Sequence, residues 1–367
     1  MAKTGGRKDN GGFFGKVSHA VLRTLAGFNA MSVALMLIAA SCQWLSPDVL
    51  AFSGIVCMLF PILVAVNICF LPFWLLFRPR YMLITFLGLV FCAGSLYSYC
   101  PVLTGQKEPT SDGLKVLSFN TYGWGREHGT VDGVNPTVQF CLDQQPDVMF
   151  LQEMPNVGKY NELLENDGYT IVRPQQRGNH SVVTRLPVVD TLDLSLPTQH
   201  CNGAIAARLL WNGDTITVVS VHLESYHLLD DDREAYVNVV ENPTGDGTKT
   251  RAKSLMNKML PCLKFHGVQA DVLAEFVERE MEAGRHVILG GDFNDVPNSY
   301  AAATMRSLLT DCFRKSGRGV GYTFNESMMY VRIDHIFCSE TLKPVKTWVD
   351  KTTIYSDHYP ILTVLER

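Results

Sequence analysis

Three uncharged, strongly apolar runs in the first hundred residues restrict what this chain can fold into. They occupy residues 25–44, 49–77 and 81–99, and each is close to or above the roughly 20 residues that a helix needs to cross a bilayer. Three consecutive helices without a polar face would be unusual in a water-soluble domain. The sequence therefore predicts an all-α transmembrane region of three helices at residues 25–99, after a basic cytoplasmic tail at residues 1–24.

The basic residues around these runs predict which side of the membrane each end faces. Five Lys and Arg residues precede the first run, Arg78 and Arg80 separate the second from the third, and residues 45–48 contain none. Three spans then place the rest of the chain on the extracytoplasmic side of the inner or plasma membrane. The alternative for the first run is a cleaved lipoprotein-type signal that ends at Cys42, although residues 39–41 match such a signal poorly. In that case the two remaining spans would also leave the globular domain on the extracytoplasmic side.

The globular part of the chain, residues 113–367 after a linker at 100–112, contains short apolar segments that end in polar residues. Segment 286–290 is followed by Gly-Asp-Phe-Asn, which places Asp292 and Asn294 on the same side of an extended strand. Similar segments, and a Ser-Asp-His near the C-terminus, deliver Asn120, Glu153, His222, Asp334, Asp357 and His358. One such ending could be an ordinary turn, but together they indicate a single site of carboxylates, amides and imidazoles.

This set of side chains suits the hydrolysis of a phosphate ester. The hard oxygen ligands, which fit Mg²⁺ or Mn²⁺ better than Zn²⁺, are Asn120, Glu153 and Asp357. Such an ion polarises a phosphoryl oxygen, a carboxylate such as Asp292 can orient and deprotonate water, and imidazoles such as His222 can donate hydrogen bonds to the phosphate. The sequence has no Walker-type glycine-rich loop and no Gly-x-Ser-x-Gly elbow, so a serine nucleophile has no support.

The motifs occur in one order along the chain: Leu-Ser-Phe-Asn120, Leu-Gln-Glu153, Ser-Val-His222-Leu, Gly-Gly-Asp292-Phe-Asn294, Arg-Ile-Asp334-His-Ile-Phe and Ser-Asp357-His358. In this order they resemble the endonuclease/exonuclease/phosphatase superfamily, which includes DNase I-like nucleases, abasic-site endonucleases, inositol-polyphosphate phosphatases and neutral sphingomyelinases. The resemblance covers residues 113–367 and is specific for the superfamily, not for any branch. It implies a catalytic domain with a DNase I-like α/β (α+β) fold, a two-sheet sandwich flanked by helices.

The resemblance also implies a metal centre and a paired histidine. Glu153 would be the principal metal ligand, with Asn120 beside it and Asp357 near the ion. The expected cofactor is Mg²⁺, with Mn²⁺ as the alternative. His358 would contact the scissile phosphate, and Asp334 would pair with His358.

The remaining implied roles concern water and phosphate. Asp292 would position the attacking water, Asn294 would stabilise the pentacovalent phosphorus centre, and His222 would be a second phosphate contact. One motif departs from the family pattern, because His180 stands where an apolar residue often follows Gly-Asn. We expect His180 to be a surface residue or a support behind the site, not a ligand, and Asn179 to be a weaker candidate for substrate contact.

The charge of the globular part bears on the substrate. Residues 101–367 hold 25 basic and 34 acidic residues, a net charge of −9, because the first hundred contain seven basic and two acidic residues. A protein that binds duplex DNA usually carries a basic face, so nucleic acid is disfavoured as a partner. Arg177, in the segment 173–177, is a weak candidate for a phosphate contact, and a solvated loop is the alternative.

Three classes of function remain open. We favour a membrane-anchored, divalent-metal-dependent phosphodiesterase or phosphatase that acts on lipid headgroups or small phosphate esters, because the anchor and the acidic domain suit it. An extracytoplasmic endonuclease or exonuclease acting on DNA or RNA fits the motifs equally well, and a non-catalytic binding module is the third class. The insertion at residues 224–266, which directly follows His222 and carries several Lys and Arg residues, is either a specificity or membrane-facing loop or a solvated insertion.

Overall fold

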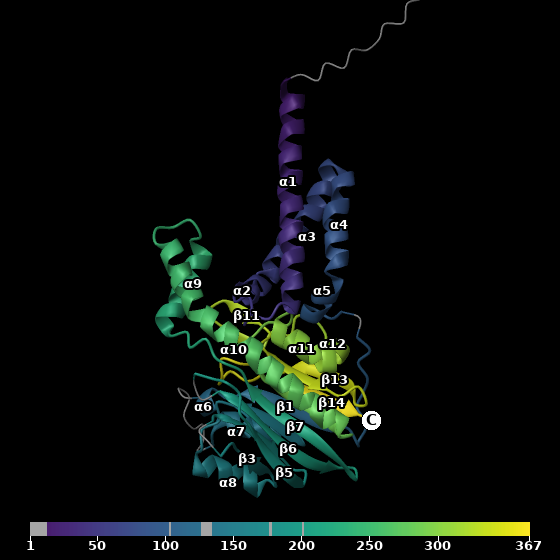
Figure 1. Cartoon of the computed structure of the whole chain (residues 1–367), viewed down its shortest axis with the longest axis vertical. Helices are drawn as coiled ribbons and strands as arrows, with labels where there is room; N and C mark the ends of the chain where they lie inside the picture. Colours follow the sequence, from purple (N-terminus) through teal and green to yellow (C-terminus); the bar gives the residue numbers. More distant parts are fainter. Residues whose placement is uncertain (1–12, 103, 126–133, 176–177, 200–201) are drawn as a thin grey trace, which may run out of the picture. The chain divides into compact units, whose positions relative to one another are not determined.

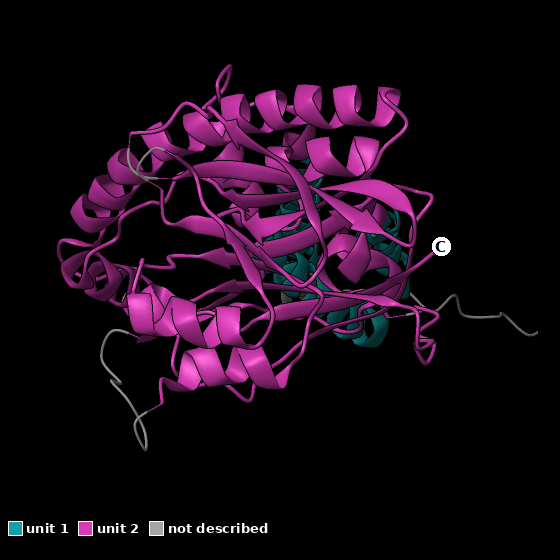
Figure 2. Cartoon of the chain, turned by 90° about the horizontal axis from the view of Figure 1, so that it is seen from below, with its two compact units in different colours: residues 1–40, 59–93 teal, residues 41–58, 94–367 magenta. Residues whose placement is uncertain are grey.

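The computed structural model describes residues 13–102, 104–125, 134–175, 178–199 and 202–367. By their internal contacts these residues form two units, which Figure 2 colours separately. The first unit comprises the described residues up to 40 together with 59–93, and the second comprises 41–58 together with the described residues from 94 onward.

The first unit consists of apolar helices. They are α1 (Phe13–Ser41), of which the last residue falls in the second unit, α3 (Phe60–Phe77) and α4 (Met82–Phe91), with a short 3₁₀ turn η2 (Pro79–Tyr81) before α4 (Figure 1). Two stretches, 19–44 and 60–77, are long and apolar enough to cross a membrane, and the bent pair 79–91 and 93–99 makes a third if it counts as one span. The apolar run expected at 49–77 is divided, because Pro61 begins α3 after a separate helix α2 (Phe52–Met58).

Polar side chains inside the first unit bond to one another. Asn67 of α3 donates to Ser32 Oγ at 3.0 Å, and Asn29 of α1 donates to Asn67 Oδ1 at 3.1 Å. Trp74 of α3 and Thr85 of α4 both donate to Asn29 Oδ1, at 2.8 and 2.9 Å. Small and polar side chains hold helices together in an apolar surrounding, so these bonds join α1, α3 and α4 into one bundle.

The second unit is built on two six-stranded sheets and a two-stranded hairpin. The first sheet runs β13 (Lys343–Val349), β14 (Ile361–Glu366), β1 (Leu114–Asn120), β2 (Val148–Gln152), β4 (His180–Thr184), β3 (Thr170–Val172). The second sheet runs β5 (Val188–Leu194), β6 (Gly203–Trp211), β7 (Asp214–His222), β8 (His286–Asp292), β12 (Asp334–Cys338), β9 (Thr310–Asp311). The hairpin pairs β10 (Phe324–Glu326) with β11 (Met329–Val331). The pairs β1–β2 and β7–β8 are parallel, and their neighbours are antiparallel.

The two large sheets pack face to face. Side chains alternate between the faces of a strand, so Val116 of β1 and Phe150 of β2 enter a core that they share with Val218 of β7 and Ile288 of β8. The outer faces are covered by helices: α7 (Pro136–Asp143) and α8 (Gly158–Asn166) on the first sheet, α10 (Thr248–Glu282) and α11 (Tyr300–Leu308) on the second. This arrangement confirms the two-sheet α/β sandwich that the motifs implied.

The insertion at residues 224–266 is helical. It holds α9 (Asp230–Glu241) and the first half of α10, which is 35 residues long. The turn between the two helices contains the residues 242–247, where Gly and Pro favour a reversal of the chain. The expected loop is therefore a helical hairpin that leaves the sandwich and returns to it along α10.

Two residues near the ends of the candidate spans, Gln43 and Ser98, bond to side chains of the catalytic part within the second unit. Buried Arg332 donates to the backbone oxygen of Ser98, at the end of α5 (Ala93–Tyr99), 234 positions earlier in the chain. Arg306 donates at 3.3 Å to Gln43 Oε1 in the 3₁₀ turn η1 (Cys42–Trp44), 263 positions earlier. Residues 41–58 and 94–112 belong to the same compact unit as the catalytic part, and these long-range bonds are two of the contacts that hold Gln43 and Ser98 in it.

Candidate active site

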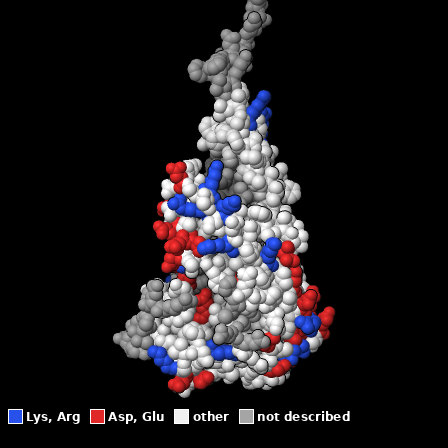
Figure 3. Space-filling model, turned by 60° about the vertical axis from the view of Figure 1, so that its left-hand side comes forward, with Lys and Arg blue, Asp and Glu red and all other residues white. Residues whose placement is uncertain are grey.

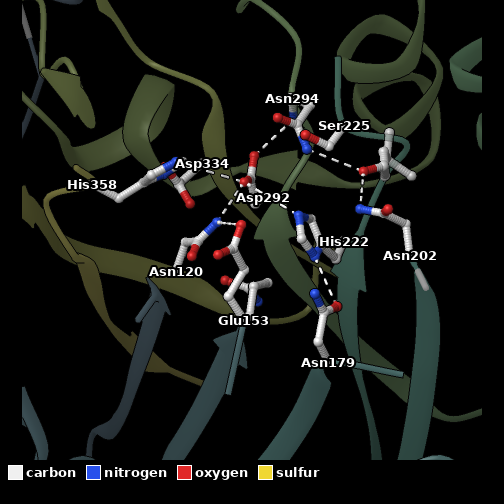
Figure 4. Close-up of polar contacts among 12 residues, drawn as sticks. Asn120, Glu153, Asn179, Asn202, His222, Ser225, Asp292, Asn294, Asp334 and His358 are labelled. Atoms are coloured by element: carbon white, nitrogen blue, oxygen red, sulfur yellow. Dashed lines mark hydrogen bonds and ion pairs between the residues drawn. The ribbon is translucent and has the colours of Figure 1, made fainter. Parts of the chain in front are cut away.

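Strand pairing brings the polar strand ends to one edge of the sandwich (Figure 4). In the second sheet, His222 at the end of β7 lies opposite Asp292 at the end of β8, and Asp292 lies opposite Asp334 at the start of β12. In the first sheet, Asn120 ends β1 beside the last residue of β2, and Glu153 follows directly. The site is thus formed by both sheets, as expected when strand ends converge at a sandwich edge.

Asp292 occupies the centre of the site and is almost fully buried. Its Oδ2 accepts from Asn120 Nδ2 at 3.0 Å and lies 3.6 Å from His222 Nε2 and 3.7 Å from His358 Nε2. Its Oδ1 accepts from the backbone N–H of Asn294 at 2.8 Å. Burial raises the pKa of Asp292, while the charge of His358 opposes that shift. A carboxylate held on several sides in this way has a fixed orientation, which a general base requires.

The backbone around Asp292 explains the glycine before it. Gly291 has a φ of 151°, and a Cβ there would lie 1.8 Å from the Val221 carbonyl oxygen of β7, so a side chain cannot be accommodated. Two site residues, Glu153 and Asn294, have a φ of 49°, in the left-handed region that L-residues rarely adopt. Such conformations cluster at functional sites, where the surrounding structure holds them in place.

His358 and Asp334 form the expected pair. His358 Nδ1 lies 2.8 Å from Asp334 Oδ2, and both side chains are buried. Burial acts to lower the pKa of His358, but the charges of Asp334 and Asp292 outweigh it and raise the pKa to about 10. His358 is therefore protonated at neutral pH, and its Nε2–H points towards Asp292 (Figure 4).

His222 is held by a different partner. Its Nδ1 lies 3.2 Å from Asn179 Oδ1, which leaves Nε2 facing Asp292. Burial lowers the pKa of His222. Behind it, His180 is buried in β4, and burial together with the charge of His222 lowers the pKa of His180 to about 4. His180 is thus not the surface residue that one of the two expectations allowed; it is a neutral support behind the site.

Of the three residues expected to hold a metal ion, Asn120 and Glu153 are in contact, and Asp357 feels the charge of Glu153. Asn120 Nδ2 is 3.5 Å from Glu153 Oε1. Burial raises the pKa of Asp357, and the nearby charge of Glu153 raises it further. Asp357 Oδ1 is buried and has no hydrogen-bond partner among the described residues. A carboxylate whose charged form is disfavoured and whose buried oxygen is unsatisfied fits a divalent cation with oxygen ligands.

A second group of potential ligands lies beside the first. Ligand atoms of Asp292, Asp334 and His358 all lie within 4.8 Å of one another. His358 Nδ1 is already bound to Asp334, and the raised pKa keeps the ring protonated, so the imidazole is a poor ligand in this arrangement. Among the described residues this trio is the group whose ligand atoms lie this close together, although its imidazole would have to lose its proton before it could bind an ion.

Sequence reasoning missed residues that the fold brings to the site. Ser356 donates to the Asn120 backbone oxygen at 2.8 Å and accepts from the His358 N–H at 3.0 Å; its place beside the Asp-His motif was the only signal. Arg233 of α9 lies 3.5 Å from Asp357 Oδ2 and also pairs with Glu326, with no signal in the sequence. Arg177, a weak candidate for substrate contact, lies outside the described residues.

Family models match both the globular part and the apolar part of the chain. The model of the endonuclease/exonuclease/phosphatase family matches residues 117–358, and the model of a domain of unknown function (DUF8431) matches residues 22–99. Comparison with curated proteins gave no match.

Several solved structures are similar to the sandwich. TDP2 of D. rerio complexed with single strand DNA product is 18% identical, with 70% of this chain and 100% of that chain covered and a TM-score of 0.48. The mannosyl-6-phosphatase of Bacteroides thetaiotaomicron is 17% identical, with coverage of 69% and 100% and a TM-score of 0.48. The catalytic domain of human Nocturnin with bound sulfate is 16% identical, with coverage of 71% and 96% and a TM-score of 0.49.

Proposed function

The chain belongs to the endonuclease/exonuclease/phosphatase family, and from this premise we propose that it is a membrane-anchored phosphoesterase that uses a divalent metal ion. Members of this family hydrolyse phosphoester bonds. The observation that carries the proposal is the position of Asp292, whose Oδ2 lies within 3.7 Å of two imidazole nitrogens and one amide nitrogen. An oriented carboxylate facing two potential hydrogen-bond donors suits the attack of water on a phosphate.

Asn120, Glu153 and Asp357 would hold the ion, Mg²⁺ or Mn²⁺. When bound, the ion supplies positive charge that polarises a phosphoryl oxygen and offsets developing negative charge. Asn120 also donates to Asp292, so the metal ligands and the proposed base are connected through one amide.

Asp292 would orient the attacking water and accept its proton. His358, kept protonated by Asp334, would donate a hydrogen bond to the phosphate oxygens as charge grows on them, and His222 would be a second contact to the phosphate. Asn294 donates to the Leu223 carbonyl at 3.0 Å, next to His222, so its amide is positioned at the same edge of the sandwich. We propose that this amide stabilises the phosphorus centre.

The substrate that we favour is a phosphate ester close to the membrane, such as a lipid headgroup. Residues 101–367 carry a net charge of −9, which repels a polyanion such as duplex DNA. Candidate spans at 19–44 and 60–77 would hold the site near lipids and raise their effective concentration.

A substrate panel tests this function on the full chain in detergent or lipid. We expect hydrolysis of a sphingomyelin-type lipid, an inositol phosphate or a p-nitrophenyl ester to exceed cleavage of plasmid DNA and RNA, because of the charge of the domain. Efficient cleavage of plasmid with every lipid and small ester untouched would establish the nuclease class instead. Inactivity on all substrates in a folded, metal-loaded chain would favour the binding module.

Labelling of introduced cysteines tests the location of the domain. Gly245→Cys and Pro79→Cys both alter exposed positions, and the parent chain supplies the background from native cysteines. We expect a membrane-impermeant maleimide to label Gly245→Cys in intact cells, or in spheroplasts if an outer membrane blocks the reagent, and to label Pro79→Cys only after permeabilisation. The reverse pattern would place the domain in the cytoplasm and make cytosolic substrates the better candidates.

A further inference from the structure

The segment that joins two candidate spans carries exposed apolar side chains. Residues 41–58 belong to the same compact unit as the catalytic domain. In the sequence they connect the end of the candidate span 19–44 to the start of the candidate span 60–77. Within this segment Trp44 is 71% exposed and Val49 86% exposed, and Phe52 is exposed as well. Tryptophan beside other apolar residues is typical of the membrane–water interface. This part of the catalytic unit therefore has the chemistry of a surface that touches lipid.

Helix α10 packs directly against that segment. A Cβ at Gly54 would lie 2.6 Å from Leu263 Cδ2, and a Cβ at Gly267 would lie 2.7 Å from Ser46 Oγ and 3.1 Å from the Asp48 backbone nitrogen. At Gly267 the backbone of Asp48 comes close enough to explain a glycine, and at Gly54 the end of the Leu263 side chain fills the space that a Cβ would need. Residues 263–267 of α10 thus lie beside the point where the chain enters the spans, and the first half of the helix extends from there.

That first half of α10 carries a basic stripe. From Thr248 to Ala270 the helix has five Lys and Arg residues and no acidic residue. At about 100° per residue, Lys249, Lys253 and Lys264 fall within about 60° of one another, and all three are exposed. The side of the helix that is buried, with Leu255, Cys262 and His266, faces away from this stripe.

Asp232 of α9 contacts α10 on a side of the helix other than the basic stripe. Lys258 pairs with Asp232 of α9 at 2.5 Å, and it is about 140° around the helix from Lys253. Asp232 is therefore paired with a lysine outside the stripe. Figure 3, in which this side of the molecule comes forward, shows Lys and Arg side chains grouped beside Asp and Glu side chains.

We propose that residues 230–264, named here the α9–α10 arm, dock through Lys249, Lys253 and Lys264 onto anionic headgroups of the bilayer in which the chain is anchored. The proposal rests on the proposed membrane anchoring and assigns a partner to the insertion. Each basic residue near an anionic surface strengthens binding by about fivefold. Half-buried Met256 and Leu260 lie between the lysines on the same side and can enter the interface.

Docking would act on the site through the base of the arm. Arg233 of α9 contacts both Asp357, a proposed metal ligand, and Glu326 of β10. The arm begins eight residues after His222, and α10 leads back to the strand that ends in Asp292. An arm held on the lipid surface would therefore keep the edge of the sandwich that carries the site close to the headgroups.

Hydrogen exchange of the full chain in nanodiscs tests this docking. We expect amides of residues 249–262 to exchange about tenfold or more slowly when phosphatidylglycerol is added to phosphatidylcholine. The protection should disappear at about 1 M salt, because the charges are then screened within a few ångströms. The double variant Lys249→Glu/Lys253→Glu should lose it, whereas the control Lys159→Glu/Lys343→Glu, with the same change in charge at exposed positions on α8 and β13, should keep it.

Equal exchange in both lipids, or an equal loss in the control variant, would overturn the proposal. Protection by a single-stranded oligonucleotide in pure phosphatidylcholine discs, with none from phosphatidylglycerol, would also overturn it and make the arm a surface for a polyanionic substrate. Two readouts on the same preparations separate the proposals: retention in membranes after an alkaline carbonate wash tests the anchoring, and hydrolysis of a soluble ester tests the activity. A chain that stays in the membrane and is active but shows no protection would refute only the docking.

Discussion

Substitution of Asp292 by asparagine is expected to lower the rate of phosphate-ester hydrolysis by about 10²-fold or more in a chain that still folds. Asparagine has nearly the same shape, so the packing against β12 remains, but it cannot accept a proton from water. The contacts of the side chain also change. Asn120 and the two imidazoles face a charged carboxylate oxygen in the parent protein and an uncharged amide group in the variant. The loss should appear mainly in kcat, since the group acts on the water and not on binding of the substrate.

The measurement combines steady-state kinetics with thermal unfolding of the full-length protein. Asp193→Asn is a matched control, because it makes the same chemical change on an exposed residue of β5. An active-site role requires a large loss in Asp292→Asn, none in Asp193→Asn and cooperative unfolding in both. Near-normal turnover of a folded Asp292→Asn protein would mean that another group activates the water.

Removal of divalent metal ions is expected to abolish activity, and addition of Mg²⁺ or Mn²⁺ is expected to restore it. Burial and the charge of Glu153 raise the pKa of Asp357, and its buried Oδ1 lacks a hydrogen-bond partner among the described residues, while the Asn120 amide lies 3.5 Å from Glu153 Oε1. A cation is the group that stabilises such an arrangement. Without the cation, the negative charge that develops on the phosphate in the transition state is not offset, and the nearby carboxylates repel it.

Glu153→Gln should raise the Mg²⁺ concentration needed for half-maximal activity by at least about tenfold, because one ligand charge is lost. Titration of the rate with Mg²⁺ and calorimetric titration of metal binding measure the effect independently. Glu162→Gln on exposed α8 serves as the control, and it should leave both titrations unchanged. Full activity in EDTA, in a protein shown by elemental analysis to retain no metal, would refute the metal dependence.

Several features of this protein follow from sequence because they depend on local periodicity. Residues i and i+2 of a strand share a face, so Asp292 and Asn294 could be placed at one strand end before any tertiary contact was known. Asn120, Glu153 and His222 were located because each follows or ends a short apolar segment, and the lack of charge within residues 25–44, 49–77 and 81–99 indicated helices for a membrane. The order of the motifs then pointed to a family and through it to a two-sheet sandwich.

The tertiary structure decided what depends on contacts between distant residues. Arg233 reaches Asp357 from a helix that follows a different strand, and Arg332 binds the Ser98 carbonyl 234 positions away. Neither arginine has a neighbour in sequence that distinguishes it from an exposed charge, because a side chain's partner is set by how the sheets and helices pack. For the same reason the lysines of residues 249–264 could be identified from the sequence, but their structural setting could not. Only the tertiary structure shows that they lie on a helix that packs beside residues 46–54.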